Sequence, residues 1–316
     1  MKKLKRYNDS YFLLLIGIMF ALIMLLSILS PYFFTLNNFK NVLNQSSLFI
    51  ILSVGMTFVI SAGEIDLSVG AILAFAGMSM GMLYQQGIPS PIVVILGLII
   101  SMGLGCINGW ITAYGRINSF IVTLSSMTIL RGLILLMMNA KSLFGFGTFF
   151  GYIGSGDVGI INVPIVIALV ITVIAEFTLR KTKYGNYCLF LGSNETALNR
   201  TGVNVKKYKM MVFALSGLCA GIAGLIVMSR LNSAEPLAGQ GYEMSAIAAV
   251  ILGGTNLQGG KGTIKGTFVA CLILNIIDNG LTLMAVSTHY QEIITGVIII
   301  LSVVISDRNT RNKKEV

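Results

Sequence analysis

The chain has 316 residues, of which 55% are apolar and 11% are charged, whereas a soluble domain carries about 25% charged residues. Together with a mean hydropathy of +0.85, this excludes an ordinary soluble fold and indicates an integral membrane protein. The net charge of +10 comes from Lys and Arg at the ends of apolar runs. Such clustering is typical of a topology signal, so we expect contact with lipid and no nucleic-acid partner.

The first apolar run, residues 11–29, follows the basic residues Lys2, Lys3, Lys5 and Arg6. A signal peptide has this order, but the run is too long and lacks a small-x-small cleavage site. We therefore expect an uncleaved first membrane span.

Apolar runs near the roughly 20 residues needed to cross a bilayer recur along the chain. Ten are expected, at 11–30, 42–60, 67–84, 91–112, 118–138, 164–180, 209–229, 243–256, 264–286 and 290–306. The eighth is short and runs into the glycine-rich stretch 253–262, which predicts a broken or re-entrant helix. We interpret residues 1–316 as one all-α membrane domain.

The distribution of the 22 Lys and Arg residues orients these spans. Cytoplasmic segments carry an excess of positive charge. Ten spans with the N-terminus inside place both tails, 1–10 and 307–316, in the cytoplasm together with the basic segment 181–208. Both termini are therefore predicted to be cytoplasmic.

The stretch SAGEIDLSVG, residues 61–70, interrupts the apolar sequence with Glu64 and Asp66. It lies where the second span ends, so Asp66 or Ser68 is expected to cap the exposed amides of the third span. Irregular backbone at membrane depth must be covered by protein or line water. A border of the inner pore mouth is thus the alternative role for Asp66 and Ser68.

The cytoplasmic segment contains the signals of one short helix. Asn194 is placed to cap residues 195–200, and Gly202 is placed where such a helix should end. A short helix parallel to the membrane is suited to docking into a soluble partner.

Catalytic and metal-binding patterns are absent from the sequence. The stretch GGTNLQGGKGT fails as a phosphate-binding loop, because Gly262 follows Lys261 and Thr255 replaces the first required glycine. The four cysteines are far apart and the chain has one histidine, so we expect no metal site and no cofactor in this chain. A transporter or channel subunit is the expected class, and an enzyme is not.

Polar residues within the spans are either contacts for a solute or hydrogen bonds between helices, and the sequence leaves both open. They are Asn44, Gln45, Asn108, Asn118, Thr123, Asn256, Asn275 and Asn279. For two deeper charges, Arg131 and Asp278, a structural ion pair between them is one possibility, whereas Glu176 and Glu292 lie near span ends and can reach solvent.

Five stretches together resemble the permease of bacterial ABC sugar importers, within the branched-chain-permease-like superfamily that handles ribose, other monosaccharides and autoinducer-2. They are VGMTFVISAGEIDLSVGAILA (54–74), CINGW with INSFIVTLSSMTILRG (106–132), YGNY to GSNETALNRTGVNV (184–205), GYEMSAIAAVILGGTNLQGGKGTIKGT (241–267) and NGLTLMAVSTHYQEIITGVIII (279–300). The family usually has a glycine where this chain has Glu64.

The resemblance implies a type II ABC importer fold in the bacterial cytoplasmic membrane. Two permease copies, identical or not, would form the pore; separate ATPase subunits would bind ATP and Mg²⁺; and an extracytoplasmic binding protein would deliver a ribose-like sugar. It also implies that the short helix with Asn194, Glu195, Ala197, Arg200 and Gly202 couples to the ATPase. An ion-coupled secondary transporter is the alternative.

The resemblance further implies two pseudo-repeated halves with broken helices, and two registers are open. Residues 63–70 match 253–260, which gives parallel halves, and residues 65–68 match 242–245, which gives an inverted repeat. The fold analogy favours the inverted one.

Overall fold

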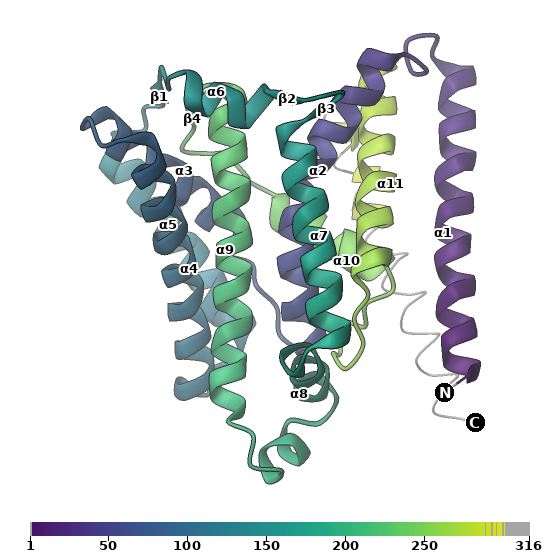
Figure 1. The fold of residues 1–316 in the computed structure, drawn as a ribbon, viewed down its shortest axis with the longest axis vertical. Helices are drawn as coiled ribbons and strands as arrows, with labels where there is room; N and C mark the ends of the chain where they lie inside the picture. The colour runs from purple at the N-terminus through teal and green to yellow at the C-terminus, as the bar shows by residue number, and fades with distance from the viewer. Residues whose placement is uncertain (1, 288, 292, 295, 299, 301–316) are drawn as a thin grey trace.

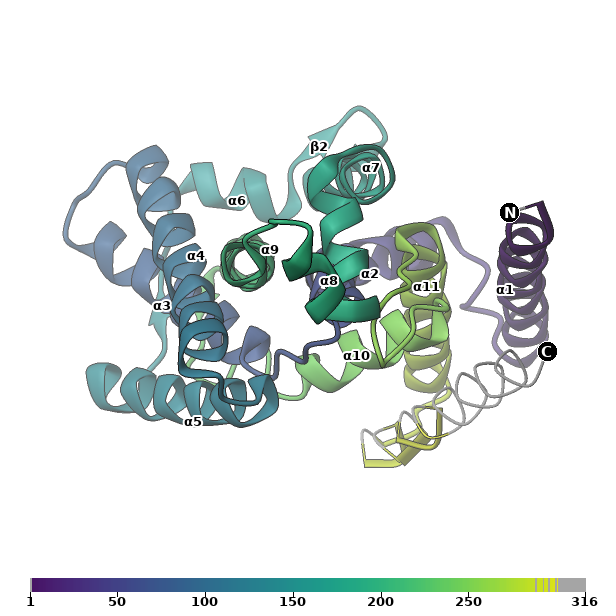
Figure 2. The same ribbon diagram turned by 90° about the horizontal axis from the view of Figure 1, so that it is seen from below.

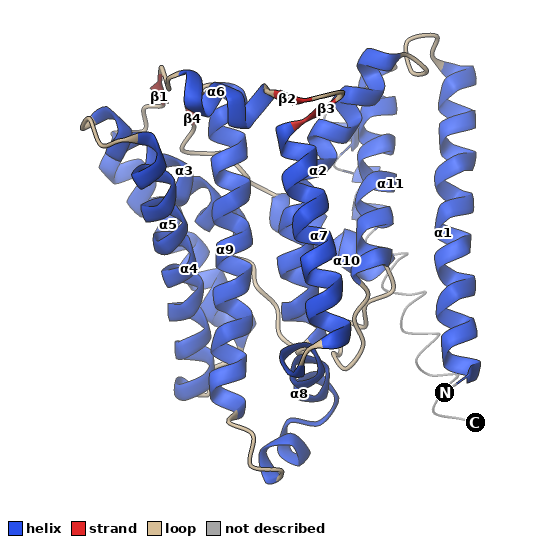
Figure 3. Cartoon of the chain, viewed as in Figure 1, coloured by secondary structure: helices blue, strands red, loops and turns tan. Residues whose placement is uncertain are grey.

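The computed structural model describes residues 2–300 except 288, 292, 295 and 299. These residues form a helical bundle whose long helices run side by side (Figures 1 and 3). The helices are α1 (Lys2–Leu29), α2 (Leu36–Ser61), α3 (Val69–Gln85), α4 (Ser90–Gly115), α5 (Ser119–Met138), α6 (Thr148–Ser155), α7 (Val163–Lys181), α8 (Lys183–Arg200), α9 (Val205–Leu231), α10 (Tyr242–Leu252) and α11 (Ile264–Leu283).

The first nine of the ten predicted spans correspond to α1 to α5, α7 and α9 to α11. Within the described residues, seven of these helices are long and apolar enough to cross a membrane, and α3 and α10 are shorter. With 11 residues, α10 is too short to span a bilayer, as expected for a broken helix. The predicted tenth span, 290–306, lies largely outside the described residues, as do Glu292 and the tail 307–316.

Three features differ from the sequence-based expectation. Helix α1 begins at Lys2, so the basic N-terminal residues continue the helix instead of forming a separate tail. Helix α6 and two short antiparallel strand pairs were not predicted, because none has an apolar run of spanning length. The pairs join β1 (Leu143–Phe144) to β4 (Ser233–Ala234), far apart in the sequence, and β2 (Asp157–Val158) to β3 (Ile161–Asn162) in a hairpin.

Helices α2 and α9 form the centre of the bundle. In the apolar window of α2, 78% of the residues are buried, and in that of α9 67%, against 11% for α1 at the edge (Figure 2). Glycines allow the closest approach, since a Cβ on Gly105 of α4 would overlap the carbonyl oxygen of Phe213 in α9. Small residues of α4 and α9 therefore pack against each other.

The two central helices run in opposite directions. Helix α9 follows directly after α8 and rises from the end of the bundle where α8 lies, whereas α2 ends there (Figure 1). Each is followed by non-helical chain and then by a shorter helix, α3 or α10. This arrangement favours the inverted register over the parallel one.

Candidate functional site

The break between α2 and α3 is organised by one buried carboxylate, that of Asp66. Its Oδ1 accepts hydrogen bonds from Ser68 N at 3.0 Å and Ser68 Oγ at 2.5 Å, and its Oδ2 accepts one from Ser216 Oγ in α9 at 2.9 Å. Asn108 of α4 donates through Nδ2 to Ser68 Oγ at 2.9 Å. All four residues are buried, so this network joins the break to α4 and α9 without reaching solvent.

Helix α5 holds the backbone of the same break. Ser119 Oγ accepts the Ile65 amide at 3.1 Å, and Thr123 Oγ1 accepts the Leu67 amide at 3.1 Å. Both donors lie outside the helices, where no intrahelical carbonyl can receive them. The break is therefore a fixed structure with its polar groups satisfied by three neighbouring helices.

The expected capping of the α3 amides by Asp66 or Ser68 is not confirmed. Ser68 makes no side-chain hydrogen bond to α3, because its hydroxyl is engaged with Asp66 and Asn108. Asp66 does accept the Ser68 amide just before the helix. Burial raises the pKa of Asp66, and the hydrogen bonds from Ser68 and Ser216 partly oppose that rise. Because Asp66 is fully buried, the structure gives it no contact with an open pore.

Helix α8 consists of two helical parts joined at Asn194, whose φ of −163° and ψ of 91° are not helical. Asn194 Oδ1 accepts the Ala197 amide at 2.9 Å, which is the predicted cap. Gly202 follows the helix at φ +82°, as predicted for its end. Asn194, Glu195, Ala197, Arg200 and Gly202 are all exposed, and Leu198 anchors this short helix in the bundle.

Four glycines from three segments meet at the first part of α8. We call Gly63, Gly192, Gly259 and Gly260 the glycine junction. A Cβ on Gly259 would lie 2.8 Å from the Cα atoms of both Gly63 and Gly192, and one on Gly192 would lie 2.5 Å from Gly260 N. Gly260 N also donates to Ser61 O at 2.9 Å. The first part of α8 is thus in direct backbone contact with the break after α2 and with the loop after α10.

Lys209, in the first turns of α9, bridges two carboxylates. Its Nζ lies 2.7 Å from Glu64 Oε1 and 3.1 Å from Glu195 Oε2. The Glu64 and Lys209 side chains are each 13% exposed, whereas that of Glu195 is 53% exposed. Glu64, which departs from the family pattern, is therefore the partner of a lysine that also contacts the short helix of α8.

Three further amides of the predicted set have structural roles, whereas Asn44 Oδ1 is buried without a hydrogen-bond partner in the described part of the chain. Asn118 caps α5 by accepting the Phe120 amide at 2.9 Å, and Asn256 accepts the Gln258 amide at 3.2 Å within the loop after α10. Asn279 exchanges two hydrogen bonds of 2.9 Å with Asn38 of α2. The second possibility, a hydrogen bond between helices, therefore holds for Asn279.

The possible ion pair between Arg131 and Asp278 does not form. Arg131 Nη1 donates to the carbonyl oxygens of Pro236 and Ala238, at 3.1 and 2.8 Å, in the chain that precedes α10. Unpaired backbone carbonyls in this irregular stretch satisfy the guanidinium in place of a carboxylate. Glu176 pairs with Arg180 one turn along α7, consistent with its position near the end of a span.

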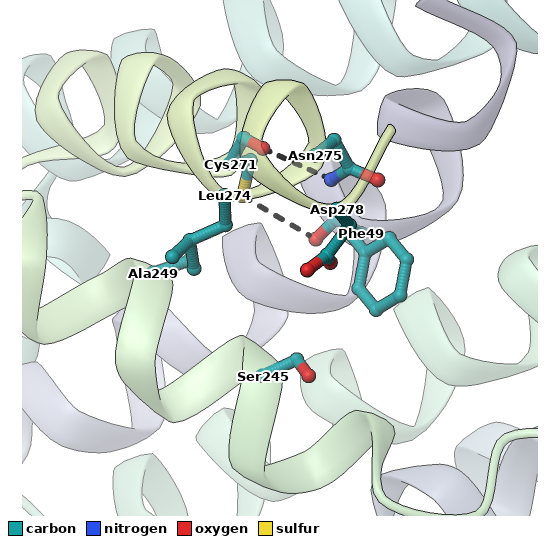
Figure 4. Close-up of a pocket in the computed structure, with 7 residues that line it drawn as sticks. All are labelled: Phe49, Ser245, Ala249, Cys271, Leu274, Asn275 and Asp278. Carbon is teal, nitrogen blue, oxygen red and sulfur yellow. Dashed lines mark hydrogen bonds between the residues drawn. The ribbon is translucent and has the colours of Figure 1, made fainter. Parts of the chain in front are cut away.

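Asp278 instead lines a small recess between α2, α10 and α11, together with Phe49, Ser245 and Asn275 (Figure 4). Asn275 donates to Cys271 O in its own helix at 2.9 Å. The sequence placed Asn275 among the polar candidates but gave no reason to bring it together with Ser245 or Phe49. Ser216, Gly192 and Lys209 were also missed, since their partners lie on other helices.

Comparison with known proteins identifies the family. The family described as "Branched-chain amino acid transport system / permease component" matches residues 38–303. The ribose import permease protein of Escherichia coli K12 is 42% identical over 91% of each chain, and that of Bacillus subtilis is 40% identical over 92% of this chain and 91% of its own. The D-allose transport system permease protein of Escherichia coli K12 is 38% identical over 95% of this chain and 93% of its own. No solved structure matches. The chain belongs to the family of permease components of branched-chain amino acid transport systems.

Proposed function

We propose that this chain is the membrane permease subunit of an ATP-driven importer for a ribose-like monosaccharide. The observation that carries the proposal is 42% identity over 91% of the chain to a protein named as a ribose import permease. Two other relatives are named for the transport of D-allose and of xylose, which supports a monosaccharide as the substrate.

The short helix of α8 supports a coupling role. Residues 194–197 and 200–202 are exposed at the end of the bundle, where a soluble ATPase subunit has access to them. A rigid-body movement of this helix is transmitted through the glycine junction to the breaks next to α3 and α10. The backbone contacts there are too close to absorb such a movement. The second route is Lys209, which contacts both Glu195 and Glu64.

The assembly follows from this role. ATP and Mg²⁺ bind to separate ATPase subunits on the α8 side, a second permease copy completes the pore, and an extracytoplasmic binding protein delivers the sugar on the other side. The α8 side is then cytoplasmic, in accord with the basic residues at both ends of α8. The complex is placed in the bacterial cytoplasmic membrane with both termini inside.

The test is reconstitution of the chain with an ABC ATPase and a sugar-binding protein from the same organism. In proteoliposomes, uptake of labelled D-ribose should require ATP, the binding protein and this chain together. Uptake by this chain alone, driven by a proton or sodium gradient, would refute the proposal. D-Allose and D-xylose serve as parallel substrates, so that a different monosaccharide is recognised as such.

The alternative is an ion-coupled secondary transporter, and one observation favours it. Asp278 is a carboxylate within an apolar helix, the kind of group that such carriers use to bind the driving ion. The same reconstitution decides the matter, since only the secondary transporter works without ATP.

A further inference from the structure

We infer that the recess formed by Phe49, Ser245, Asn275 and Asp278 is a hydroxyl-binding subsite on the path of the transported sugar. The inference rests on the proposed function for its ligand and on the structure for its location. Figure 4 shows the four side chains drawn together from α2, α10 and α11.

The first step concerns the charge of Asp278. Among the residues that the structure describes, its carboxylate has neither an ion-pair partner nor a hydrogen-bond donor, although it lies in a span. A carboxylate facing lipid without a partner costs about 2.5 to 3.5 kcal/mol or more. The side chain is partly exposed, so the surface onto which the recess opens faces water or protein, not lipid.

The second step is independent and concerns α10. This helix has 11 residues and is preceded by irregular chain, including Pro236 and Gly241. Helices and closed barrels alone can face lipid, because any other backbone leaves polar groups unsatisfied there. The irregular chain before α10 is therefore turned toward water or protein, and Ser245 lies in the first turn of the helix that follows it. Phe49 lies at the middle of α2, which places the recess deep in the bundle.

The third step concerns which chemical group fits the recess. The recess is about the size of one water molecule, so it takes a single hydroxyl group and not a whole sugar ring. The Asp278 carboxylate accepts from such a hydroxyl, and the Ser245 hydroxyl and the Asn275 amide can accept or donate. The centroid of the Phe49 ring lies 4.8 Å from that of the Tyr242 ring. The Phe49 ring gives an apolar wall for the C–H face of the sugar ring. This combination suits a polyhydroxylated, uncharged solute.

The first experiment measures access and occupancy. Ser245→Cys is made in a Cys106→Ala background, since the other three cysteines are buried. A charged methanethiosulfonate reagent should label Ser245→Cys in the assembled complex, and transported sugar should slow labelling several-fold. The matched control is Val173→Cys on the exposed apolar face of α7, which should stay unlabelled. Absence of labelling at position 245, or labelling that no sugar slows, overturns the inference.

The second experiment measures transport. Asp278→Asn in the complete importer should raise KM for the sugar about tenfold, the loss expected for one charge-assisted hydrogen bond, while the unfolding temperature stays the same. If wild-type uptake is ATP-driven and KM is unchanged in Asp278→Asn, the subsite is refuted while the proposed function stands. If Asp278→Asn separates the two permease copies without changing KM, the recess is an interface and the inference is also refuted. If wild type shows no ATP-driven uptake, the proposed function fails, and the labelling result still decides whether the recess is open to sugar.

Discussion

Lys209 Nζ lies 2.7 Å from a carboxylate oxygen of Glu64, in a contact where each side chain is only 13% exposed. The contact joins the start of α9 to the break between α2 and α3. The same lysine reaches Glu195 at 3.1 Å, but Glu195 is more than half exposed, and such pairs contribute little to stability. The Glu64 contact is therefore the one expected to fix the geometry between the break and the short helix of α8.

Glu64→Gln should destabilise the folded chain by about 1 to 3 kcal/mol, between the values for exposed and buried ion pairs. It should also lower the number of sugar molecules imported per ATP hydrolysed, because movement of the short helix would reach the break less directly. Thermal unfolding in detergent and paired uptake and ATPase assays provide the measurements.

Glu195→Gln is the matched control for that prediction, since it removes the exposed partner of the same lysine. Its effect on unfolding should be smaller. A double-mutant cycle with Lys209→Met isolates the Glu64 contribution. Equal effects of Glu64→Gln and Glu195→Gln on both measurements would contradict the role assigned to Glu64.

Sequence predicted the features that depend on neighbouring residues. The cap by Asn194, the end at Gly202 and the shortness of α10 follow from signals within a few positions, and the structure confirms them. Asp66 was placed correctly at the start of α3, but its burial depends on Asn108 and Ser216, which come from helices distant in the sequence.

Pairing residues by opposite charge alone gave no correct partner where backbone carbonyl groups were available. Arg131 was considered as a partner for Asp278 because both are charged and deep, yet carbonyl groups of the irregular chain before α10 satisfy Arg131. No local sequence pattern indicates that such carbonyl groups lack a backbone hydrogen-bond donor. The sequence indicated no partner for Glu64 for a related reason. Lys209 was interpreted only as one of the positive charges on the cytoplasmic side, although it contacts Glu64 in the structure.

Gly192→Ala should disrupt the glycine junction. Its Cβ would overlap Ser61 O and come within 2.9 Å of Gly259 Cα, and backbone atoms at this contact cannot move aside cheaply. We expect the free energy of unfolding to fall by about 1 to 3 kcal/mol or more, as at overpacked sites. Thermal unfolding and the yield of folded protein after detergent extraction measure the effect.

Gly103→Ala is the control for the junction, because a Cβ there meets nothing within 4 Å and lies in the middle of α4. Alanine is favoured over glycine in a helix by about 1 kcal/mol, so this variant should be as stable as wild type or more so. If Gly192→Ala also matched wild type in stability and in uptake per ATP, close backbone packing at the junction would not transmit movement.

Asn279→Ala should affect stability and leave sugar affinity unchanged. It removes both hydrogen bonds to Asn38 and leaves the buried Asn38 Oδ1 without a donor, at a cost of about 1 to 3 kcal/mol. The double variant with Asn38→Ala should be destabilised by less than the sum of the single effects. Asp278, the preceding residue, is expected to give the opposite result, with a raised KM and unchanged stability. A raised KM in Asn279→Ala would place this amide on the sugar path.

Asp66→Asn should change how stability depends on pH. Burial raises the pKa of Asp66 above its ordinary value of 3.8, so the folded chain holds the proton more tightly than the unfolded chain. The contribution of Asp66 to the free energy of unfolding is then largest below about pH 3.8. It declines as the pH rises from the unfolded pKa to the folded pKa, and above that it is constant.

Asparagine cannot ionise, so Asp66→Asn should lack this decline. Unfolding of both forms in detergent between about pH 4 and pH 8 should show wild type losing stability relative to the variant as the pH rises. Ser216→Ala, which removes one of the hydrogen bonds that oppose the rise in pKa, should extend the decline of wild type to higher pH. Parallel curves for wild type and Asp66→Asn would mean that Asp66 has the same proton affinity in the folded and unfolded chain, in conflict with its full burial.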